Sequence, residues 1–191
     1  NAGHMLVLGG PGSGKTTIAL LKARRMVLER LQPEQSVLFL SFSNAAIRRI
    51  MESAGNVLTS EIGRQVEIKT YHSFAWDILQ SHGYLLSSQR KLGIVAAQDA
   101  AVIRAGLEDD AWLAEEDRLF QEDGRATYDQ FAPRAADILE RSAVVRDCFC
   151  SAHPLILVDE FQDTDEDQWR LIRALSENSE VIALGDTEQR I

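Results

Sequence analysis

The sequence has few residues that could cross-link it and no run that could span a membrane. Its two cysteines, Cys148 and Cys150, are two positions apart and cannot staple a fold of 191 residues, so a reducing cytoplasm is the expected location. No apolar run approaches the roughly 18–20 residues that cross a bilayer, and we expect no membrane contact. Residues 1–5 lack the basic and apolar regions of a signal peptide, and we interpret them as a cloning scar.

Positive charge is also scarce over the whole chain. The net charge is −9 and the isoelectric point is near 4.9, which argues against binding of nucleic acid by bulk charge. The distribution is uneven, because residues 1–105 hold 12 basic and 7 acidic side chains, whereas residues 106–191 hold 8 and 22. A local basic track on the first half remains compatible with these counts.

Short apolar runs alternate with segments of helical periodicity over most of the chain. Apolar residues make up 45% of the sequence, enough for a buried core. Gly55 and Gly83 are expected to end the second and third predicted helices. Strands without polar alternation, separated by helices, predict an α/β fold with a parallel sheet flanked by helices. The predicted strands are 5–9, 37–41, 66–70, 155–158 and 181–184, and the predicted helices are 16–31, 44–54, 73–81 and 165–176.

One region breaks this alternation. Residues 85–150 contain no convincing strand but have helical patterns over 95–107, 111–122 and 128–150. We therefore predict an α/β domain formed by 6–84 and 151–191, with residues 85–150 as a helical insertion subdomain.

The segment from Gly9 to Thr16 matches the phosphate-loop pattern G-x-x-x-x-G-K-[ST] in full, after a predicted strand and at the start of a predicted helix. Glycines let the backbone turn its N–H groups onto phosphate oxygens, and the helix N-terminus adds partial positive charge. Lys15 is expected to reach the β- and γ-phosphates, and the Thr16 hydroxyl to bind Mg²⁺. The competing interpretation is a glycine-rich turn with a surface lysine. The residues predicted to bind the nucleotide in this loop are Gly10, Pro11, Gly12, Ser13, Gly14, Lys15, Thr16 and Thr17.

Two carboxylates follow the apolar strand 155–158. Ligands of doubly wound sheets bind beyond the carboxyl ends of the strands, so Asp159 is placed to reach Mg²⁺, directly or through water. Glu160 is placed to orient or deprotonate an attacking water. Two solvated carboxylates at a strand end are the simpler alternative, which the phosphate loop in the same chain disfavours. Together these motifs predict a Mg²⁺-dependent nucleoside triphosphatase.

The residues after Asp159 resemble those of a particular family. Residues 159–164, D-E-F-Q-D-T, resemble the second motif of superfamily 1 DNA helicases of the UvrD/Rep/PcrA group. Four further segments resemble motifs of that family in the same order, namely 9–17, 41–46, 70–74 and 185–191. The resemblance covers nearly the whole chain and implies the N-terminal RecA-like P-loop NTPase domain of such a helicase, with the insertion at 85–150 where the family carries its second subdomain.

The resemblance also implies roles for matched positions. Lys15 and Glu160 would be catalytic, Thr16 and Asp159 would hold the metal, and Gln189 would sense the γ-phosphate of ATP. Gln162 and Asp163 would link the nucleotide site to the DNA side. The residues that would lie along the track of single-stranded DNA are Phe42, Ser43, Asn44, Tyr71 and His72.

At the level of function, the resemblance implies an ATP-dependent DNA helicase that moves 3′-to-5′ along single-stranded DNA together with a second RecA-like domain of the same polypeptide. Residues 1–191 alone are expected to bind ATP weakly and hydrolyse it poorly. The alternative is a nucleotide-dependent DNA-binding or regulatory module of a repair, recombination or defence complex that does not unwind DNA itself.

Several of these side chains have structural alternatives. Phe42 could pack at the end of its strand, and Tyr71 and His72 could cap the helix that begins nearby. Arg48 and Arg49 could supply local positive charge to the DNA track or could simply lie on a solvated helix face. The aromatic and aliphatic residues expected in the core rather than at a ligand are Phe74, Trp76, Ile78, Trp169, Ile172 and Leu175.

Overall fold

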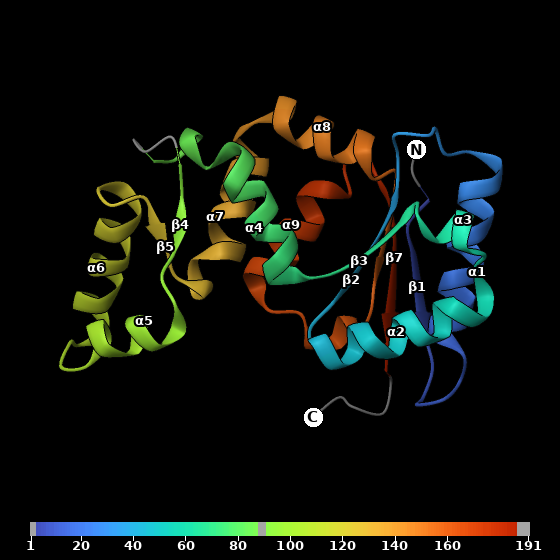
Figure 1. Ribbon diagram of the computed structural model, residues 1–191, viewed down its shortest axis with the longest axis horizontal. Helices are drawn as coiled ribbons and strands as arrows, with labels where there is room; N and C mark the ends of the chain where they lie inside the picture. The colour runs from blue at the N-terminus through green and yellow to red at the C-terminus, as the bar shows by residue number, and fades with distance from the viewer. Residues whose placement is uncertain (1–2, 88–90, 187–191) are drawn as a thin grey trace.

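The computed structural model describes residues 3–87 and 91–186, which form a parallel five-stranded sheet with helices on both faces (Figure 1). The strand order is β1-β7-β6-β2-β3, and every neighbouring pair is parallel. This confirms the predicted α/β fold with a parallel sheet. The strands are β1 (Met5–Leu8), β2 (Val37–Ser41), β3 (Val66–Thr70), β6 (Leu155–Val158) and β7 (Glu180–Gly185).

Each face of the sheet has its own helical layer and its own hydrophobic cluster. On β2, Val37 and Phe39 belong to one cluster, and Leu38 and Leu40 belong to the other, as expected when successive side chains point to opposite faces. Both clusters are closed by helices, so the central strands are apolar on both sides. One layer contains α1 (Lys15–Glu29), α2 (Asn44–Val57) and α3 (Ser60–Gly63), and the other contains α4 (Tyr71–His82), α7 (Phe131–Arg141), α8 (Ala143–Ala152) and α9 (Glu166–Leu175).

Polar side chains cap the N-termini of several helices, among them α2, α4 and α9. The Oγ of Ser43 accepts a hydrogen bond from the N–H of Ala46 (3.1 Å), and Thr70 Oγ1 accepts one from Ser73 (3.0 Å). Asp165 Oδ1 accepts the N–H of Gln168 at 2.8 Å. These caps satisfy donors that the first helical turn leaves free. Thr70 therefore caps α4, and the alternative that Tyr71 or His72 does so is wrong.

The predicted end of the second helix differs from the structure, and one short helix was not predicted. Helix α2 continues through Gly55 to Val57, so the prediction that Gly55 ends this helix is wrong. A glycine inside a helix costs only about 0.5–1 kcal/mol relative to alanine, which burial of Ala46 and Ile50 on the same helix can offset. Helix α3 follows after two residues and was not predicted, because four residues carry no helical periodicity.

The segment that was expected to lack strands contains two. Strands β4 (Gly93–Ile94) and β5 (Arg125–Ala126) pair in parallel as a separate small sheet, with helices α5 (Ala97–Arg104) and α6 (Asp109–Gln121) between them. The prediction of an all-helical insertion is therefore wrong in this detail. Strands of two residues are too short to produce an alternating pattern in the sequence. Figure 1 shows this lobe on the far side of α4 and α7 from the main sheet.

The rest of the predicted insertion is part of the main body. The helical pattern over 128–150 is divided at Ser142 into α7 and α8. Phe131, Ile138 and Leu139 of α7 are buried in the same cluster as Leu40 of the central sheet. The limits of the insertion stay a prediction, but α7 and α8 belong to the main body, and Arg134 of α7 also contacts Asp117 and Phe120 of the lobe formed by β4 to β5.

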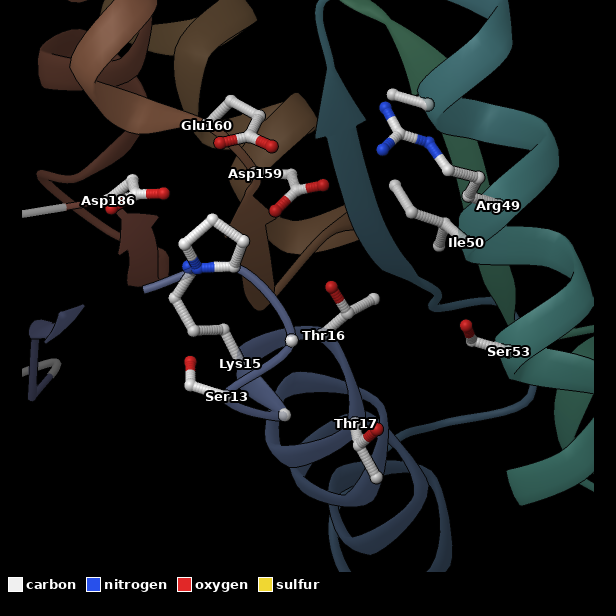
Figure 2. A pocket seen from close by; sticks show the side chains of 14 residues that line it. Ser13, Lys15, Thr16, Thr17, Arg49, Ile50, Ser53, Asp159, Glu160 and Asp186 are labelled. Carbon is white, nitrogen blue, oxygen red and sulfur yellow. The ribbon is translucent and has the colours of Figure 1, made fainter. Parts of the chain in front are cut away.

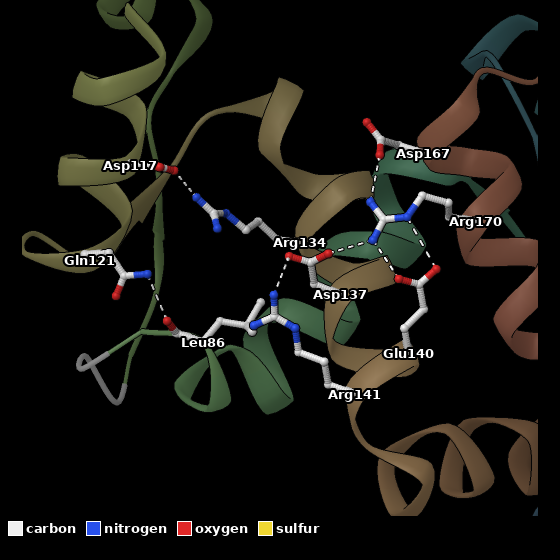
Figure 3. A network of polar contacts seen from close by, with 9 residues as sticks. All are labelled: Leu86, Asp117, Gln121, Arg134, Asp137, Glu140, Arg141, Asp167 and Arg170. Atoms are coloured by element: carbon white, nitrogen blue, oxygen red, sulfur yellow. Dashed lines mark hydrogen bonds and ion pairs between the residues drawn. The ribbon is translucent and has the colours of Figure 1, made fainter. Parts of the chain in front are cut away.

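Charged side chains join α7 to α9 (Figure 3). The guanidinium of Arg170 on α9 lies 2.7 Å from Asp137 Oδ1 and 2.7 Å from Glu140 Oε2 of α7, and 3.0 Å from Asp167 Oδ1 on its own helix. Its hydrogen bond holds the pKa of Glu140 below the usual value for a glutamate. One cation thus compensates three carboxylates at the boundary between the two helices.

We expect Arg170→Ala to lower the free energy of unfolding by about 1–2 kcal/mol, because three neighbouring carboxylates lose their shared partner. For a chain of this size that is a fall of about 2–8 °C in the melting temperature, measured by calorimetry near neutral pH. The stabilisation by Glu140 is complete above its ordinary pKa and is lost as the pH falls through its lowered pKa, so the difference from wild type should shrink in acid.

Arg141→Ala is the control, since Arg141 makes one long contact of 3.7 Å with Asp137 and is 71% exposed. Equal melting temperatures for the two variants would contradict the role given to Arg170.

Over the two described ranges, no helix has both the length and the apolar character that crossing a membrane requires.

Candidate nucleotide-binding site

The candidate site is a cavity of about 440 Å³ at the carboxyl ends of the sheet strands (Figure 2). The predicted loop residues from Pro11 to Thr17 line it together with Asp159 and Glu160. The structure therefore brings together two segments that are far apart in the sequence, because β1 and β6 both neighbour β7. The lining residues that were not assigned to this site are Ala46, Arg49, Ile50, Ser53 and Asp186.

Two glycines give the loop its shape. Gly12 has φ 73° and Gly14 has φ 85°, a left-handed backbone conformation that other residues rarely adopt. Gly14 stands immediately before Lys15, the first residue of α1, and the N–H of Ser13 donates to the carbonyl of Gly10 at 3.2 Å. The turn thus wraps the backbone around the N-terminus of α1, where N–H groups without helical partners point outward.

Lys15 folds over its own loop. The ammonium donates to the carbonyl of Gly9, with a close contact, and to the carbonyl of Gly10 at 3.2 Å. Gly10 contributes to the site through this contact rather than through the cavity wall. Thr16 follows in the first turn of α1, and its hydroxyl points toward the Asp159 side of the cavity in Figure 2.

Asp159 is 8% exposed and continues the pairing of β6, because its N–H donates to the carbonyl of Leu40 at 2.9 Å. Burial raises the pKa of its carboxyl, the neighbouring Glu160 adds to this rise, and Lys15 and Arg49 oppose it. The Thr16 hydroxyl and this carboxylate are the hard oxygen donors that Mg²⁺ prefers.

The donor set fits a magnesium ion that is shared with a nucleotide. Among residues 3–87 and 91–186 there is no group of three or more His, Cys, Asp or Glu side chains that could hold a metal alone. Magnesium at phosphate-transfer sites is commonly bound by one or two protein ligands and by substrate phosphates. Thr16 and Asp159 could therefore hold Mg²⁺ together with a triphosphate.

The backbone and one side chain fix Glu160. It has φ 49°, the one positive value at a non-glycine residue in the described ranges. Gln162 Nε2 donates to Glu160 Oε2 at 2.8 Å, and Gln162 Oε1 accepts the N–H of Asp186 at 2.9 Å. Gln162 therefore connects Glu160 at the end of β6 to the end of β7. Gln189, the predicted γ-phosphate sensor, lies outside the described residues.

A second cavity of about 660 Å³ lies between the ends of β2 and β3 and the insertion. Phe42, Ser43, Asn44 and His72 line it, so the structure brings these four predicted DNA contacts together. Tyr71 does not belong with them. It is 1% exposed, and its ring packs against that of Phe42 with the centroids 5.0 Å apart.

The sequence did not predict three aromatic residues that line this second cavity, which we call the groove, namely Trp76, Tyr128 and Phe131. Trp76, expected in the core, lines the groove and stacks on Phe131 with ring centroids 4.9 Å apart. Tyr128 comes from the insertion and is 44% exposed. No local signal could have found it, because only the packing of α7 on α4 brings residue 128 to this place.

Trp169 of α9, which does not line the groove, was also expected in the core but is 46% exposed, whereas Ile172 and Leu175 are buried as predicted.

Comparison with known proteins gives one family and several relatives. The model of the family described as "AAA domain" matches residues 1–191. The ATP-dependent DNA helicase PcrA of Leuconostoc citreum is 24% identical over 233 aligned residues, with 99% of this chain and 31% of the relative covered. The ATP-dependent DNA helicase Rep of Escherichia coli is also 24% identical, with 99% and 34% covered.

A shorter match is more similar in sequence. The RecBCD enzyme subunit RecB of Mycolicibacterium smegmatis is 42% identical over 66 residues, which cover 34% of this chain and 6% of the relative. The chain thus spans about a third of the length of the curated helicases that it matches along its whole length.

Proposed function

The chain belongs to the AAA domain family, and we propose that it is the ATP-binding motor domain of a UvrD/Rep-like DNA helicase. The observation that carries the proposal is the convergence of the phosphate loop with Asp159 and Glu160 on one cavity. Similarity to PcrA and Rep along 99% of the chain supports the same assignment. A cytoplasmic location is part of the proposal, because Cys148 and Cys150 are both free thiols.

In the proposed reaction, the residues from Gly10 to Thr17 bind the phosphates of ATP, with Lys15 directed to the β- and γ-phosphates. Thr16 and Asp159 would hold Mg²⁺, which would supply positive charge to offset the negative charge that develops on the phosphate. Glu160 accepts the proton of the attacking water, and Gln162 keeps its carboxylate aimed at the cavity. We retain Gln189 as the proposed sensor of the γ-phosphate.

We further propose that the groove lined by Phe42, Trp76 and Tyr128 binds single-stranded DNA. Aromatic faces can stack on any base, and the hydroxyl, amide and imidazole groups of Ser43, Asn44 and His72 can bind phosphates. Binding in such a groove therefore does not depend on the base sequence of the DNA. In the proposed cycle, a second RecA-like domain of the same polypeptide closes on this surface when ATP binds and reopens after hydrolysis, which steps the protein 3′-to-5′.

The binding experiment for this groove is Tyr128→Ala with a fluorescent oligothymidylate. Loss of one stacking face is expected to weaken binding by about 5-fold to 100-fold, since base–aromatic stacking contributes about 1–3 kcal/mol per base. Tyr84→Ala is the matched control, because Tyr84 is 53% exposed and does not line the groove. Equal affinities for the two variants would contradict this DNA site, and the nucleotide site would be unaffected.

The test of the proposed motor function is nucleotide binding to this chain, followed by ATP turnover with and without single-stranded DNA. Binding of ATP with magnesium, and DNA-stimulated turnover when the second domain is present, are the expected results. A chain that folds but binds no nucleotide would overturn the proposal.

A further inference from the structure

One face of helix α2 forms a wall of the nucleotide cavity. Ala46, Arg49, Ile50 and Ser53 all line it, and their spacing of three, four and seven residues places them on a single helical face. Ala46 and Ile50 are buried, which fixes the rotation of the helix against the sheet. Arg49 is thereby held at the cavity, opposite the phosphate loop.

The guanidinium of Arg49 is directed from α2 toward the carboxylate of Asp159 (Figure 2). It has no ion pair or hydrogen bond with any of the residues that the structure describes, and it lines the cavity with its five N–H donors available. Arg48 precedes it in the chain, but successive residues of a helix are turned by about 100°, and Arg48 does not line the cavity.

The two cations of the cavity stand on different walls. Lys15 rises from the phosphate loop, whereas Arg49 lies on the side where β6 ends in Asp159 and Glu160. The phosphate loop holds the inner phosphates of a nucleotide, so the Asp159 side is where the terminal phosphate comes to lie. A guanidinium fits phosphate oxygens in a bidentate manner and stays charged at all ordinary pH values.

We propose that Arg49 binds the terminal phosphate of ATP, so that this chain itself supplies a second phosphate-binding cation in addition to Lys15. The inference rests on the proposed nucleotide site. It depends on the position of Arg49 at the cavity, which the sequence does not reveal. Arg49 would thereby help the site to distinguish ATP from ADP, because ADP has no γ-phosphate. Arg49 should therefore contribute to the affinity for ATP and not to the affinity for ADP.

The experiment measures the dissociation constants of ATP and ADP with magnesium by isothermal titration calorimetry. In Arg49→Ala, we expect about 10-fold weaker ATP binding and an ADP affinity within about 2-fold of wild type, as for loss of a charge-assisted hydrogen bond. Arg49→Lys should recover only part of the loss, because an ammonium cannot make the bidentate contact. Arg48→Ala is the matched control and should leave both constants unchanged.

The outcomes separate this inference from the proposed function. Equal losses of ATP and ADP affinity in Arg49→Ala, or no loss at all, would overturn the role of Arg49 while leaving the nucleotide site intact. Failure of the wild-type chain to bind either nucleotide would overturn both. Arg49 is exposed on its helix, so the variants are expected to fold, and their melting temperatures verify this.

Discussion

Lys15→Ala is expected to abolish measurable nucleotide binding, with the dissociation constant for ATP raised by about 100-fold or more. The ammonium is the one lysine charge in the described cavity, and loss of one partner of a desolvated charge pair costs about 2–5 kcal/mol. The side chain contacts the carbonyls of Gly9 and Gly10 and belongs to neither hydrophobic cluster. Its removal therefore leaves the packing of the core unchanged. Calorimetric titration of ATP with magnesium measures the effect.

Lys22→Ala is the matched control for this variant. Lys22 lies on the same helix, outside the cavity, and pairs with Glu180 at 3.0 Å. Its replacement should leave ATP affinity unchanged. Unaltered ATP affinity in Lys15→Ala would remove the phosphate-loop assignment and the proposed function with it.

In the protein that also carries the second RecA-like domain, Glu160→Gln is expected to preserve ATP binding and to lower the rate of ATP turnover by about 100-fold to 10,000-fold, the contribution typical of a positioned general base. The amide has nearly the same size as the carboxylate and can still pair with Gln162, but it cannot accept a proton from water at neutral pH. Single-turnover hydrolysis and equilibrium binding of ATP, measured on the same preparation, separate the two effects.

Glu166→Gln serves as the comparison, because Glu166 is an exposed residue in the first turn of α9 and does not line the cavity. We expect its turnover to match wild type. Near-normal turnover in Glu160→Gln would show that Glu160 is not the base. Loss of ATP binding in that variant would instead give Glu160 a role in binding the nucleotide.

Local sequence patterns predicted much of the candidate nucleotide site because they encode their own geometry. The spacing of glycines, lysine and threonine from Gly9 to Thr16 defines a loop at a helix N-terminus without reference to the rest of the chain. The run 155–158 ends in Asp159 in the same local way. A parallel sheet then requires the two segments to meet at one edge, and the structure has both on the same cavity.

The sequence by itself therefore determined the fold class, the positions of the main strands along the chain, and the local arrangement of the candidate phosphate loop and strand-end carboxylates. Only the tertiary structure decided which faces of the helices meet the cavities. It placed Arg49 but not Arg48 at the candidate nucleotide cavity. It also buried Tyr71 against Phe42 and brought Tyr128 of the insertion to the same groove as Trp76. The physical reason is that helix rotation and the docking of an insertion are set by burial of side chains from many segments at once, which no short stretch of sequence records.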